Sequence, residues 1–251
     1  MYGGHGRLLR VDLAKNKISQ EQISEKLFEK FLTGAGLATH YLLREVPKGA
    51  DPLGPENELI LMTGALTGTT APSTGRFNWV FKSPLTGLWA QSNSAGFWGV
   101  DFKKTGFDGI IFHGISTKPV YLLINEENVE LKDASHLWGK GVFETTDLVR
   151  KELGEKFNVD CIGIAGENLV RYASIMNDLH RAAGRCGGGA VMGSKKLKAI
   201  AVFGKKPVKL ANPGSFAEVA KKQFELLDQH MFKVALETFG TNVVIDLVNV
   251  R

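Results

Sequence analysis

The run from Asn177 to Lys198 constrains this chain most, because it combines many glycines with basic side chains. No acidic residue occurs between Asp178 and Glu218. Glycine lets a backbone adopt positive φ and approach a bulky ligand. Successive N–H groups there form an anion-binding concavity, to which a helix N-terminus adds its dipole. Since Arg181 and Arg185 add bidentate donors, the run predicts a cradle for a phosphorylated ligand, with a plain structural turn as the alternative.

Two familiar phosphate-binding motifs do not match this run. The Walker pattern requires Lys-Ser/Thr after its second glycine, whereas the order here is Gly193-Ser194-Lys195. The Rossmann pattern requires G-x-G-x-x-G directly after a strand, whereas Gly187, Gly189 and Gly193 are spaced more widely and follow a polar loop. The run therefore belongs neither to an ordinary NTPase nor to a dinucleotide-binding fold.

Composition is that of a globular protein without a membrane span. The chain has 251 residues, 43% hydrophobic and 23% charged, which suits one large or two small domains. Its net charge of +5 fits an anionic ligand, but a nucleic-acid binder usually concentrates far more charge. No stretch approaches about 20 apolar residues and no signal peptide opens the chain. We therefore expect a cytoplasmic protein that binds neither nucleic acid nor membrane.

The two cysteines lie in different settings and form no C-x-x-C pair. Cys161 precedes an apolar run, where a buried thiol is expected. Cys186 lies among arginines that would lower its pKa, although a packing role is the simpler interpretation. The chain alone therefore shows no zinc or iron–sulfur site.

Hydrophobic periodicity predicts a mixture of strands and short helices. Strands are expected over residues 6–13, 58–63, 77–82, 88–91, 109–114, 119–125, 129–132, 160–164, 170–176 and 199–203. Helices are expected over residues 24–32, 37–45, 100–105 and 143–153, the first of them capped by Ser24. Arg76 ends a long polar loop over residues 64–75, so a solvated charge and a ligand donor both remain open for it.

A shift of 90 residues aligns two parts of the chain. Gly99 falls on Gly189, and residues 110–114 fall on residues 200–204. Each unit has a strand, a polar loop with glycine, a short helix and a strand closed by glycine. This similarity indicates a duplication, with two equivalent loops that face one ligand region and form two phosphate cradles.

From Pro207 the composition changes. A helix is expected over residues 216–227, and helical patterning continues to Asp246. We therefore expect a first domain over residues 1–210 and the beginning of a truncated helical domain over residues 211–251.

Six stretches of the chain carry a specific resemblance to a known family. They read M-Y-G-G-H-G-R-L-L-R-V-D-L, D-P-L-G-P-E-N-E-L-I, S-P-L-T-G, D-A-S-H-L-W-G-K, A-G-E-N-L-V and A-A-G-R-C-G-G-G-A-V-M-G-S-K-K-L-K-A-I. In this order they resemble the N-terminal domain of the tungsten-containing aldehyde:ferredoxin oxidoreductases. The resemblance implies an α+β fold in which two repeated β-rich halves form a cofactor-binding base, followed by the start of an all-helical domain.

The resemblance also implies a cofactor and the residues that contact it. The cofactor is a tungsten (or molybdenum) ion held by two molybdopterins, with magnesium bridging the pterin phosphates. The implied first-domain contacts, together with Arg185 as a phosphate donor, are Arg76, Asn93, Ala95, Arg181, Ala182, Gly184 and Arg185. Magnesium takes main-chain carbonyls at the positions that match Asn93 and Ala182. Ala95 stands where the family often has glycine, and Cys186 and Gly188 also depart from the usual spelling.

The family's iron–sulfur ligands are missing from these residues. In the family, the cysteines of the [4Fe–4S] cluster and the Glu and His near the metal come from the helical domains. The whole enzyme would oxidise an aldehyde to a carboxylic acid with water and pass two electrons to ferredoxin. We therefore expect this chain alone to be inactive, and the [4Fe–4S] cluster to come only from a missing helical part or helical subunit. A homodimer of the full enzyme is one expected arrangement.

Three hypotheses of function follow. The chain is the N-terminal part of such an oxidoreductase, or a separately encoded pterin-binding subunit of a related W/Mo enzyme such as an aromatic acyl-CoA reductase. The third is an unrelated phosphate- or RNA-binding domain, which would expose aromatic side chains. Phe77, Trp79 and Phe81 alternate along a strand instead, which is typical of a core. The sequence leaves open the choice between tungsten and molybdenum, the substrate and the oligomeric state.

Overall fold

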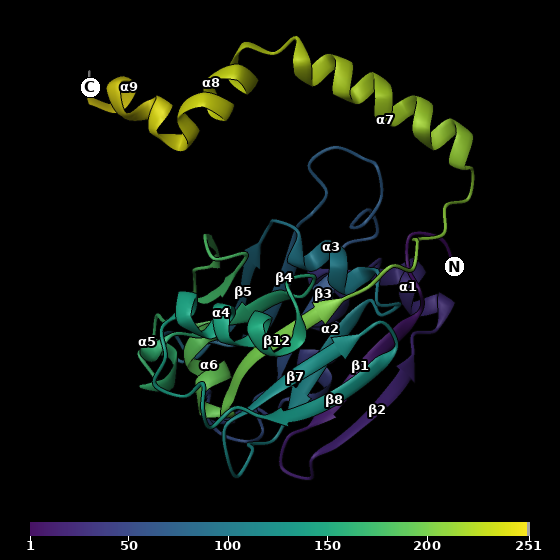
Figure 1. Cartoon of the computed structure of the whole chain (residues 1–251). Helices are drawn as coiled ribbons and strands as arrows, with labels where there is room; N and C mark the ends of the chain where they lie inside the picture. Colours follow the sequence, from purple (N-terminus) through teal and green to yellow (C-terminus); the bar gives the residue numbers. More distant parts are fainter. Residues whose placement is uncertain (250–251) are drawn as a thin grey trace. The chain divides into compact units, whose positions relative to one another are not determined.

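The structure, a computed structural model, describes residues 1–249 (Figure 1). It divides into two units, each described by itself. One consists of residues 1–69 and 74–209, and the other of residues 70–73 and those from 210 onward. Among the described residues, no helix is both long and apolar enough to cross a membrane.

The first unit contains two six-stranded sheets (Figure 1). Sheet 1 has the order β2-β1-β6-β3-β4-β5. Its strands are β1 (Arg7–Asp12), β2 (Lys17–Gln22), β3 (Leu59–Thr63), β4 (Phe77–Lys82), β5 (Trp89–Ser94) and β6 (Gly109–His113). Sheet 2 has the order β11-β10-β9-β12-β7-β8. Its strands are β7 (Val120–Asn125), β8 (Asn128–Asp133), β9 (Asn158–Cys161), β10 (Ile175–Asn177), β11 (Arg181–Ala183) and β12 (Leu197–Phe203).

The two sheets have the same topology. In each half the first strand forms an antiparallel hairpin with the second and pairs parallel with the last, β1 with β6 and β7 with β12. The third strand pairs antiparallel with the last and with the fourth, and the fourth with the fifth. The predicted α+β fold of two repeated halves is therefore confirmed.

Alternating side chains divide the unit into layers, because successive residues of a strand point to opposite faces. In β3, Leu61 lies in a core that also contains Ile200 of β12, while Ile60 faces a second core with Leu37. In β12, Ala201 faces a third core with Val149 of the helix behind sheet 2. The two sheets therefore share a central core, and helices cover their outer faces.

The outer helices follow their sequence signals. Sheet 1 is covered by α1 (Glu25–Phe31) and α2 (Ala35–Glu45), and sheet 2 by α4 (Val142–Leu153). Ser24 caps α1, and its hydroxyl accepts a hydrogen bond from the Leu27 N–H at 3.3 Å. Val46 follows α2 with extended backbone, as expected for a residue before proline.

The short helices α3 (Trp98–Lys103) and α6 (Gly188–Ser194) pack across the boundary between the halves. Helix α3 follows β5 of sheet 1 but packs on β9 and β12 of sheet 2, whereas α6 of the second half packs on β3 and β4. Trp98 donates from Nε1 to the Ile200 carbonyl at 3.1 Å. This reciprocal exchange joins the two halves around their shared core.

Three predictions for the second half are wrong in detail. The strand expected over residues 160–164 ends at Cys161, because Gly163 caps a short helix, α5 (Ile164–Glu167). The strand expected over residues 170–176 is reduced to β10, because the backbone of Ala173 accepts a hydrogen bond from Gly189 of α6 instead of pairing in the sheet. Strand β11 lies inside the run that was expected to be a loop.

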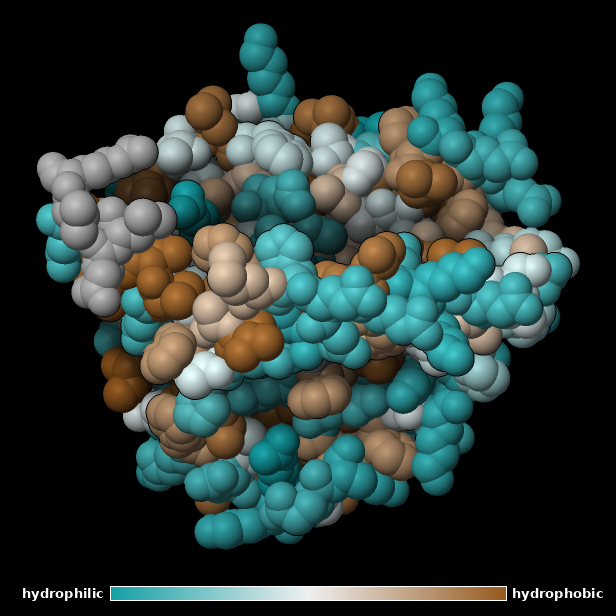
Figure 2. Space-filling model, turned by 90° about the horizontal axis from the view of Figure 1, so that it is seen from above, coloured by the Kyte–Doolittle hydropathy of each residue, from teal (hydrophilic) through white to brown (hydrophobic). Residues whose placement is uncertain are grey.

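The second unit is mainly helical over its described residues from Pro213 onward. It contains α7 (Pro213–Asp228), α8 (Met231–Phe239), the 3-10 helix η1 (Gly240–Val244) and α9 (Ile245–Asn249). Asn212 caps α7 and accepts a hydrogen bond from the Ser215 N–H at 3.1 Å. Large apolar side chains are exposed on these helices, including Val219, Phe224, Leu226, Met231, Phe232, Val234 and Phe239. Figure 2 shows hydrophobic residues interspersed with hydrophilic ones on one face of the molecule.

Candidate functional site

One edge strand from each half borders a shared hollow. Strand β5 ends sheet 1 and β11 ends sheet 2, and these two edges contact each other. The hollow has a volume of about 330 Å³. It is lined by Gln91, Ser92, Asn93, Ala182, Gly184 and Arg185. Four of these six residues are predicted site residues, and they come from loops and strands about 90 residues apart.

Strand alternation decides which side chain of β5 reaches the hollow. Ser92 and Ser94 are 3% exposed and point into the unit, so Asn93 between them points outward. Arg76, which directly precedes β4, donates from its guanidinium to the Asn93 Oδ1. The β4–β5 register sets Asn93 opposite Asn78, so Arg76 lies near the end of β5 that faces the hollow.

The second half contributes a short exposed turn. Arg181, Ala182, Gly184 and Arg185 are exposed, whereas Ala183 between them is 1% exposed and packs in the central core. The backbone N–H of Arg185 donates to the Ser92 Oγ at 3.1 Å, which ties this turn to β5. The structure thus brings the arginines of the second half to the strand that carries Asn93.

Hydrogen bonds of Asn177 and Asp178 hold the loop after β5 against the loop after β10. Asn177, which is 1% exposed, accepts from the Ser94 hydroxyl at 2.5 Å and donates to the Ala95 carbonyl at 2.8 Å. Asp178 accepts from the Phe97 N–H at 2.6 Å. Gly96 has φ +99° and lies so close to Asp178 that a Cβ would meet its Oδ2 at 2.0 Å. Ala95 therefore lies beside the site with its carbonyl already bonded.

The glycines of the central run have a different role from the one predicted. Gly187, Gly188 and Gly189 are buried, not open to a ligand. A Cβ on Gly187 would meet the Arg171 carbonyl at 2.0 Å, and one on Gly189 would meet the Ser174 carbonyl at 2.4 Å. These glycines let α6 pack closely on the preceding chain. The prediction that these three glycines form an open cradle is therefore corrected. Gly184 is the exposed glycine of the run.

The charge of the site is positive at its surface. Arg76, Arg181 and Arg185 are exposed and carry guanidinium groups. Asp160 lies behind the site on β9, opposite Asn177, and is 1% exposed. Burial raises the pKa of Asp160 well above its usual value, which favours the uncharged form of this carboxyl behind the site.

Sequence reasoning missed the residues that assemble the site. Ser92, Asn177 and Asp178 hold the two loops together, yet the sequence assigned no role to any of them, although Asn177 and Asp178 begin the glycine-rich run. The signal that could have found them is the alternation of β5, because its two buried, inward-facing serines require polar partners.

The arrangement can bind an anion between two equivalent edges. Edge strands leave alternate backbone groups without a partner in their own sheet, so both edges offer main-chain oxygens and N–H groups. Three arginines supply charged donors for phosphate. Among the described residues, no group of three or more His, Cys, Asp or Glu side chains is placed to hold a metal ion.

The chain resembles known proteins over most of its length. Residues 8–204 match the family described as the aldehyde ferredoxin oxidoreductase N-terminal domain. A tungsten-containing aldehyde ferredoxin oxidoreductase of Thermococcus kodakarensis is 49% identical over 251 residues, which cover 99% of this chain and 42% of that protein. An aliphatic sulfonate oxidoreductase, WOR-like subunit, of Pyrococcus furiosus is 39% identical over 83% of this chain and 36% of that subunit.

A solved structure has the same fold. In the active site complex BamBC of benzoyl coenzyme A reductase with 1,5-dienoyl-CoA, one chain superposes with a TM-score of 0.89 and 41% identity. The match covers 90% of this chain and 35% of that one. The chain thus spans less than half the length of these relatives. With the family match over most of the first unit, the chain belongs to the aldehyde ferredoxin oxidoreductase family, which is a family of oxidoreductases.

Proposed function

We propose that this chain forms the base for a bis-molybdopterin tungsten (or molybdenum) cofactor in an enzyme that oxidises aldehydes to carboxylic acids, with ferredoxin as the electron acceptor. The hollow between β5 and β11 carries the proposal, because it places Asn93 and Ala182 from equivalent edge strands beside one space. The tungsten named in the 49% identical relatives supports the choice of metal.

The residues at the hollow fit a phosphorylated pterin. Arg185 lines the hollow, and Arg76 and Arg181 are exposed arginines outside its lining. Guanidinium groups match the charge and the planar geometry of phosphate recognition. The space beside Gly184 is open, since a Cβ there would meet nothing nearer than the Ala182 Cβ at 3.7 Å. The volume of about 330 Å³ is at the lower end for ligand pockets. This chain would therefore form one wall of a larger site.

The roles of the chain's own residues are binding and orientation. Arg76, Arg181 and Arg185 would hold the phosphates, and the main-chain carbonyls of Asn93 and Ala182 would be ligands of a magnesium ion. When bound, the metal centre accepts the two electrons that leave the aldehyde. Ala95 would lie beside a pterin with its methyl group, on a loop whose carbonyl is fixed by Asn177.

The remaining parts of the enzyme would come from outside the first unit. Residues 1–210 would be the pterin-binding domain, and the segment from residue 211 would begin the helical part. That part, or a helical subunit, would supply the [4Fe–4S] cluster and the surface for ferredoxin. The complete enzyme would act in the cytoplasm, and a homodimer would be its expected assembly.

Cofactor content tests the proposal directly. In the complete gene product, Arg76→Ala and Arg185→Ala should each lower the tungsten and the pterin per protein about tenfold, because each removes a charged donor to phosphate. Tungsten is measured by elemental analysis, and pterin by its fluorescence after oxidation. Arg44→Ala on α2, an exposed arginine away from the hollow, is the matched control. Unchanged tungsten and pterin in both site variants would refute the proposed site.

A second candidate is a subunit of an aromatic acyl-CoA reductase. It is favoured by the 41% identity and the TM-score of 0.89 to a chain of the benzoyl coenzyme A reductase complex. The assay is aldehyde oxidation with an artificial electron acceptor, run beside dienoyl-CoA turnover on the same preparation. Aldehyde turnover alone supports the first candidate, and dienoyl-CoA turnover alone supports the second. An in-frame cysteine cluster encoded after Arg251 would also favour the first.

A further inference from the structure

A buried hydroxyl joins the two ends of the loop that carries Arg76. Thr67 is 1% exposed, and its Oγ1 donates to the main-chain carbonyl of Arg76 at 3.0 Å. The same oxygen accepts a hydrogen bond from the Gly64 N–H at 3.0 Å, and the Thr67 N–H donates to the Gly64 carbonyl at 3.2 Å. The turn after β3 is therefore closed on itself and bonded to the backbone of Arg76.

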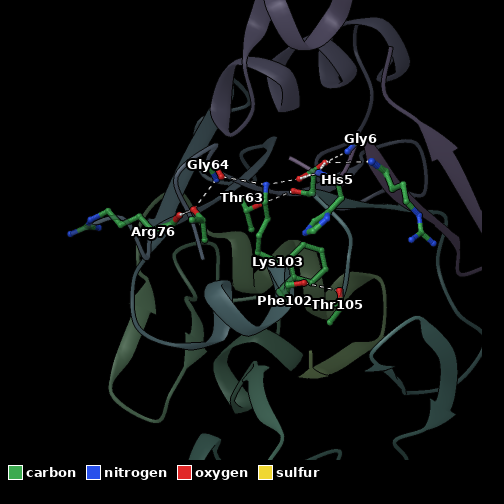
Figure 3. Close-up of polar contacts among 11 residues, drawn as sticks. His5, Gly6, Thr63, Gly64, Arg76, Phe102, Lys103 and Thr105 are labelled. Carbon is green, nitrogen blue, oxygen red and sulfur yellow. Dashed lines mark hydrogen bonds and ion pairs between the residues drawn. The ribbon is translucent and has the colours of Figure 1, made fainter. Parts of the chain in front are cut away.

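The turn rests on an ion pair inside the unit. Lys103 and Asp108 have no exposed side-chain surface and form a salt bridge, and the Lys103 amine also donates to the Gly64 carbonyl at 3.4 Å. Asp108 accepts in addition from the N–H groups of His5 and Gly6. The dashed lines in Figure 3 run from this pair through Gly64 to the backbone of Arg76. The series of hydrogen bonds thus begins at a fully buried ion pair.

The side chain of Arg76 needs such support because it lies at the surface. An exposed arginine has several free rotors, and holding it in one geometry costs conformational entropy. Its guanidinium is bonded to Asn93, and its backbone is bonded to Thr67. A Cβ on the preceding Gly75 would meet the Gly96 carbonyl at 3.0 Å, so the backbone here also lies tightly against the loop after β5. These contacts hold both the backbone and the guanidinium group of Arg76.

We propose that Thr67 is a positioning residue for Arg76. The Thr67 hydroxyl joins the Arg76 backbone, through Gly64, to the Lys103–Asp108 pair, and so positions the Arg76 guanidinium at the phosphate-binding hollow. The inference rests on the proposed function, because Arg76 must bind the cofactor for its position to matter. Thr67 is not among the residues that line the hollow, and it acts through its hydrogen bond to the Arg76 main-chain carbonyl.

The test uses the complete gene product with Thr67→Val, which keeps the shape and loses the hydroxyl, and Thr67→Ser, which keeps the hydroxyl. Thr67→Ala is a second variant without the hydroxyl, in case valine prevents folding. Hydrogen exchange at Gly64 should be about tenfold faster in the valine variant and unchanged in the serine variant. Tungsten per protein, after growth on limiting tungstate, should fall about tenfold with valine and stay normal with serine.

Combination with Arg76→Ala separates the outcomes. If Thr67 acts through Arg76, the double variant Thr67→Val/Arg76→Ala carries as much tungsten as Arg76→Ala alone. A further fall in the double variant would show a general structural role and overturn the inference. Normal tungsten in Thr67→Val, with loss in Arg76→Ala, would overturn it while leaving the proposed function intact. Normal tungsten in Arg76→Ala itself would refute the role of Arg76 and the inference with it.

Discussion

The two halves of the first unit have the same strand order but support their arginines in different ways. The first half holds Arg76 after a long loop, with Thr67 and a buried ion pair beneath it. The second half presents Arg181 and Arg185 on the short turn around β11, tied to β5 by the Ser92 hydroxyl. The two halves therefore present their arginines from different places in a duplicated frame, before the fourth strand in the first half and at the fifth strand in the second.

Each half also contains one buried lysine–carboxylate pair, and the two pairs stand in different surroundings. Lys103 pairs with Asp108 below the Arg76 loop, whereas Lys198 of β12 pairs with Glu167 of α5. Asp108 keeps backbone N–H partners at the N-terminal segment, while Glu167 also accepts from the Gly139 N–H at 2.7 Å. The two pairs therefore differ in how many hydrogen-bond donors each carboxylate would keep without its lysine.

Removal of these lysines should have the largest effect. Lys198→Met should lower the free energy of unfolding by about 3–5 kcal/mol, because the buried Glu167 carboxylate loses its charged partner and two main-chain carbonyls lose a donor. Lys103→Met should cost less, near the lower end of that range, since Asp108 keeps the N–H groups of His5 and Gly6. Urea unfolding measures both. Lys17→Met, at an exposed position on β2, is the control, and an equal or larger cost for Lys103→Met would contradict the ranking.

The equivalent glycines of the repeat should differ next. A Cβ on Gly189 would meet the Ser174 carbonyl at 2.4 Å, whereas one on Gly99 would meet the Phe77 ring at 2.5 Å. A backbone carbonyl has less room to shift than a side chain, so Gly189→Ala should cost about 3 kcal/mol and Gly99→Ala about 1–2 kcal/mol. Thermal unfolding measures the difference. Gly141→Ala, where nothing lies within 4 Å, should stay near the wild-type value, and a similar cost at all three positions would refute the close approach.

The sequence predicted more of the first half than of the second. The shift of 90 residues correctly aligned α3 with α6 and β6 with β12, because the two halves differ little in length over these segments. It missed β1 and β7, which begin at Arg7 and Val120, since the helices that follow each hairpin differ in length. Local patterns do not record such insertions, so the full repeat became visible only from strand pairing.

The candidate site was predictable in its side chains but not in its supports. The resemblance indicated Arg76, Asn93 and the residues around Ala182, and the structure brings Asn93 and Ala182 to one hollow. The contribution of Asn177 depends on Ser94 and Ala95, which lie more than 80 residues away. Buried polar networks of this kind depend on the tertiary fold, so no local spacing predicts them. The roles of the site residues stay predictions until cofactor content is measured.

A buried carboxyl in each half should make stability fall as pH rises. Burial and the nearby Glu45 raise the pKa of Glu58 to about 8, from an ordinary value of 4.5. Between these values the folded protein binds more protons than the unfolded chain, so stability falls by up to about 1.4 kcal/mol per pH unit. Asp160 of the second half, with its raised pKa, contributes in the same direction above pH 3.8.

Substitution of either carboxyl should flatten the profile. Glu58→Gln and Asp160→Asn each remove one proton-linked group, so the free energy of unfolding should depend less on pH between about 5 and 8. Chemical denaturation at several pH values measures the slope. Glu130→Gln, at an exposed position on β8, is the control and should leave the slope unchanged. An unchanged slope in both buried variants would mean that these carboxyls are ionised in the folded protein.

The surface ion pairs of Glu127, one of which joins the two halves, should have the smallest effect. Glu127, in the turn between β7 and β8, pairs with Arg7 of β1 at 2.9 Å and with Lys206 at 2.7 Å. Hydrogen bonds from Lys206 and Arg7 lower the pKa of Glu127 to about 2, so any stabilisation is present above pH 4.5 and lost as pH falls toward 2. Because the carboxylate is 54% exposed, Glu127→Gln should cost only about 0.5 kcal/mol, and less in high salt. Unfolding measured at low and high ionic strength tests this. A large loss of stability that persists in high salt would mean that the two halves depend on the ion pairs of Glu127. The shared core and the exchange of α3 and α6 would then contribute less to holding the halves together than their burial indicates.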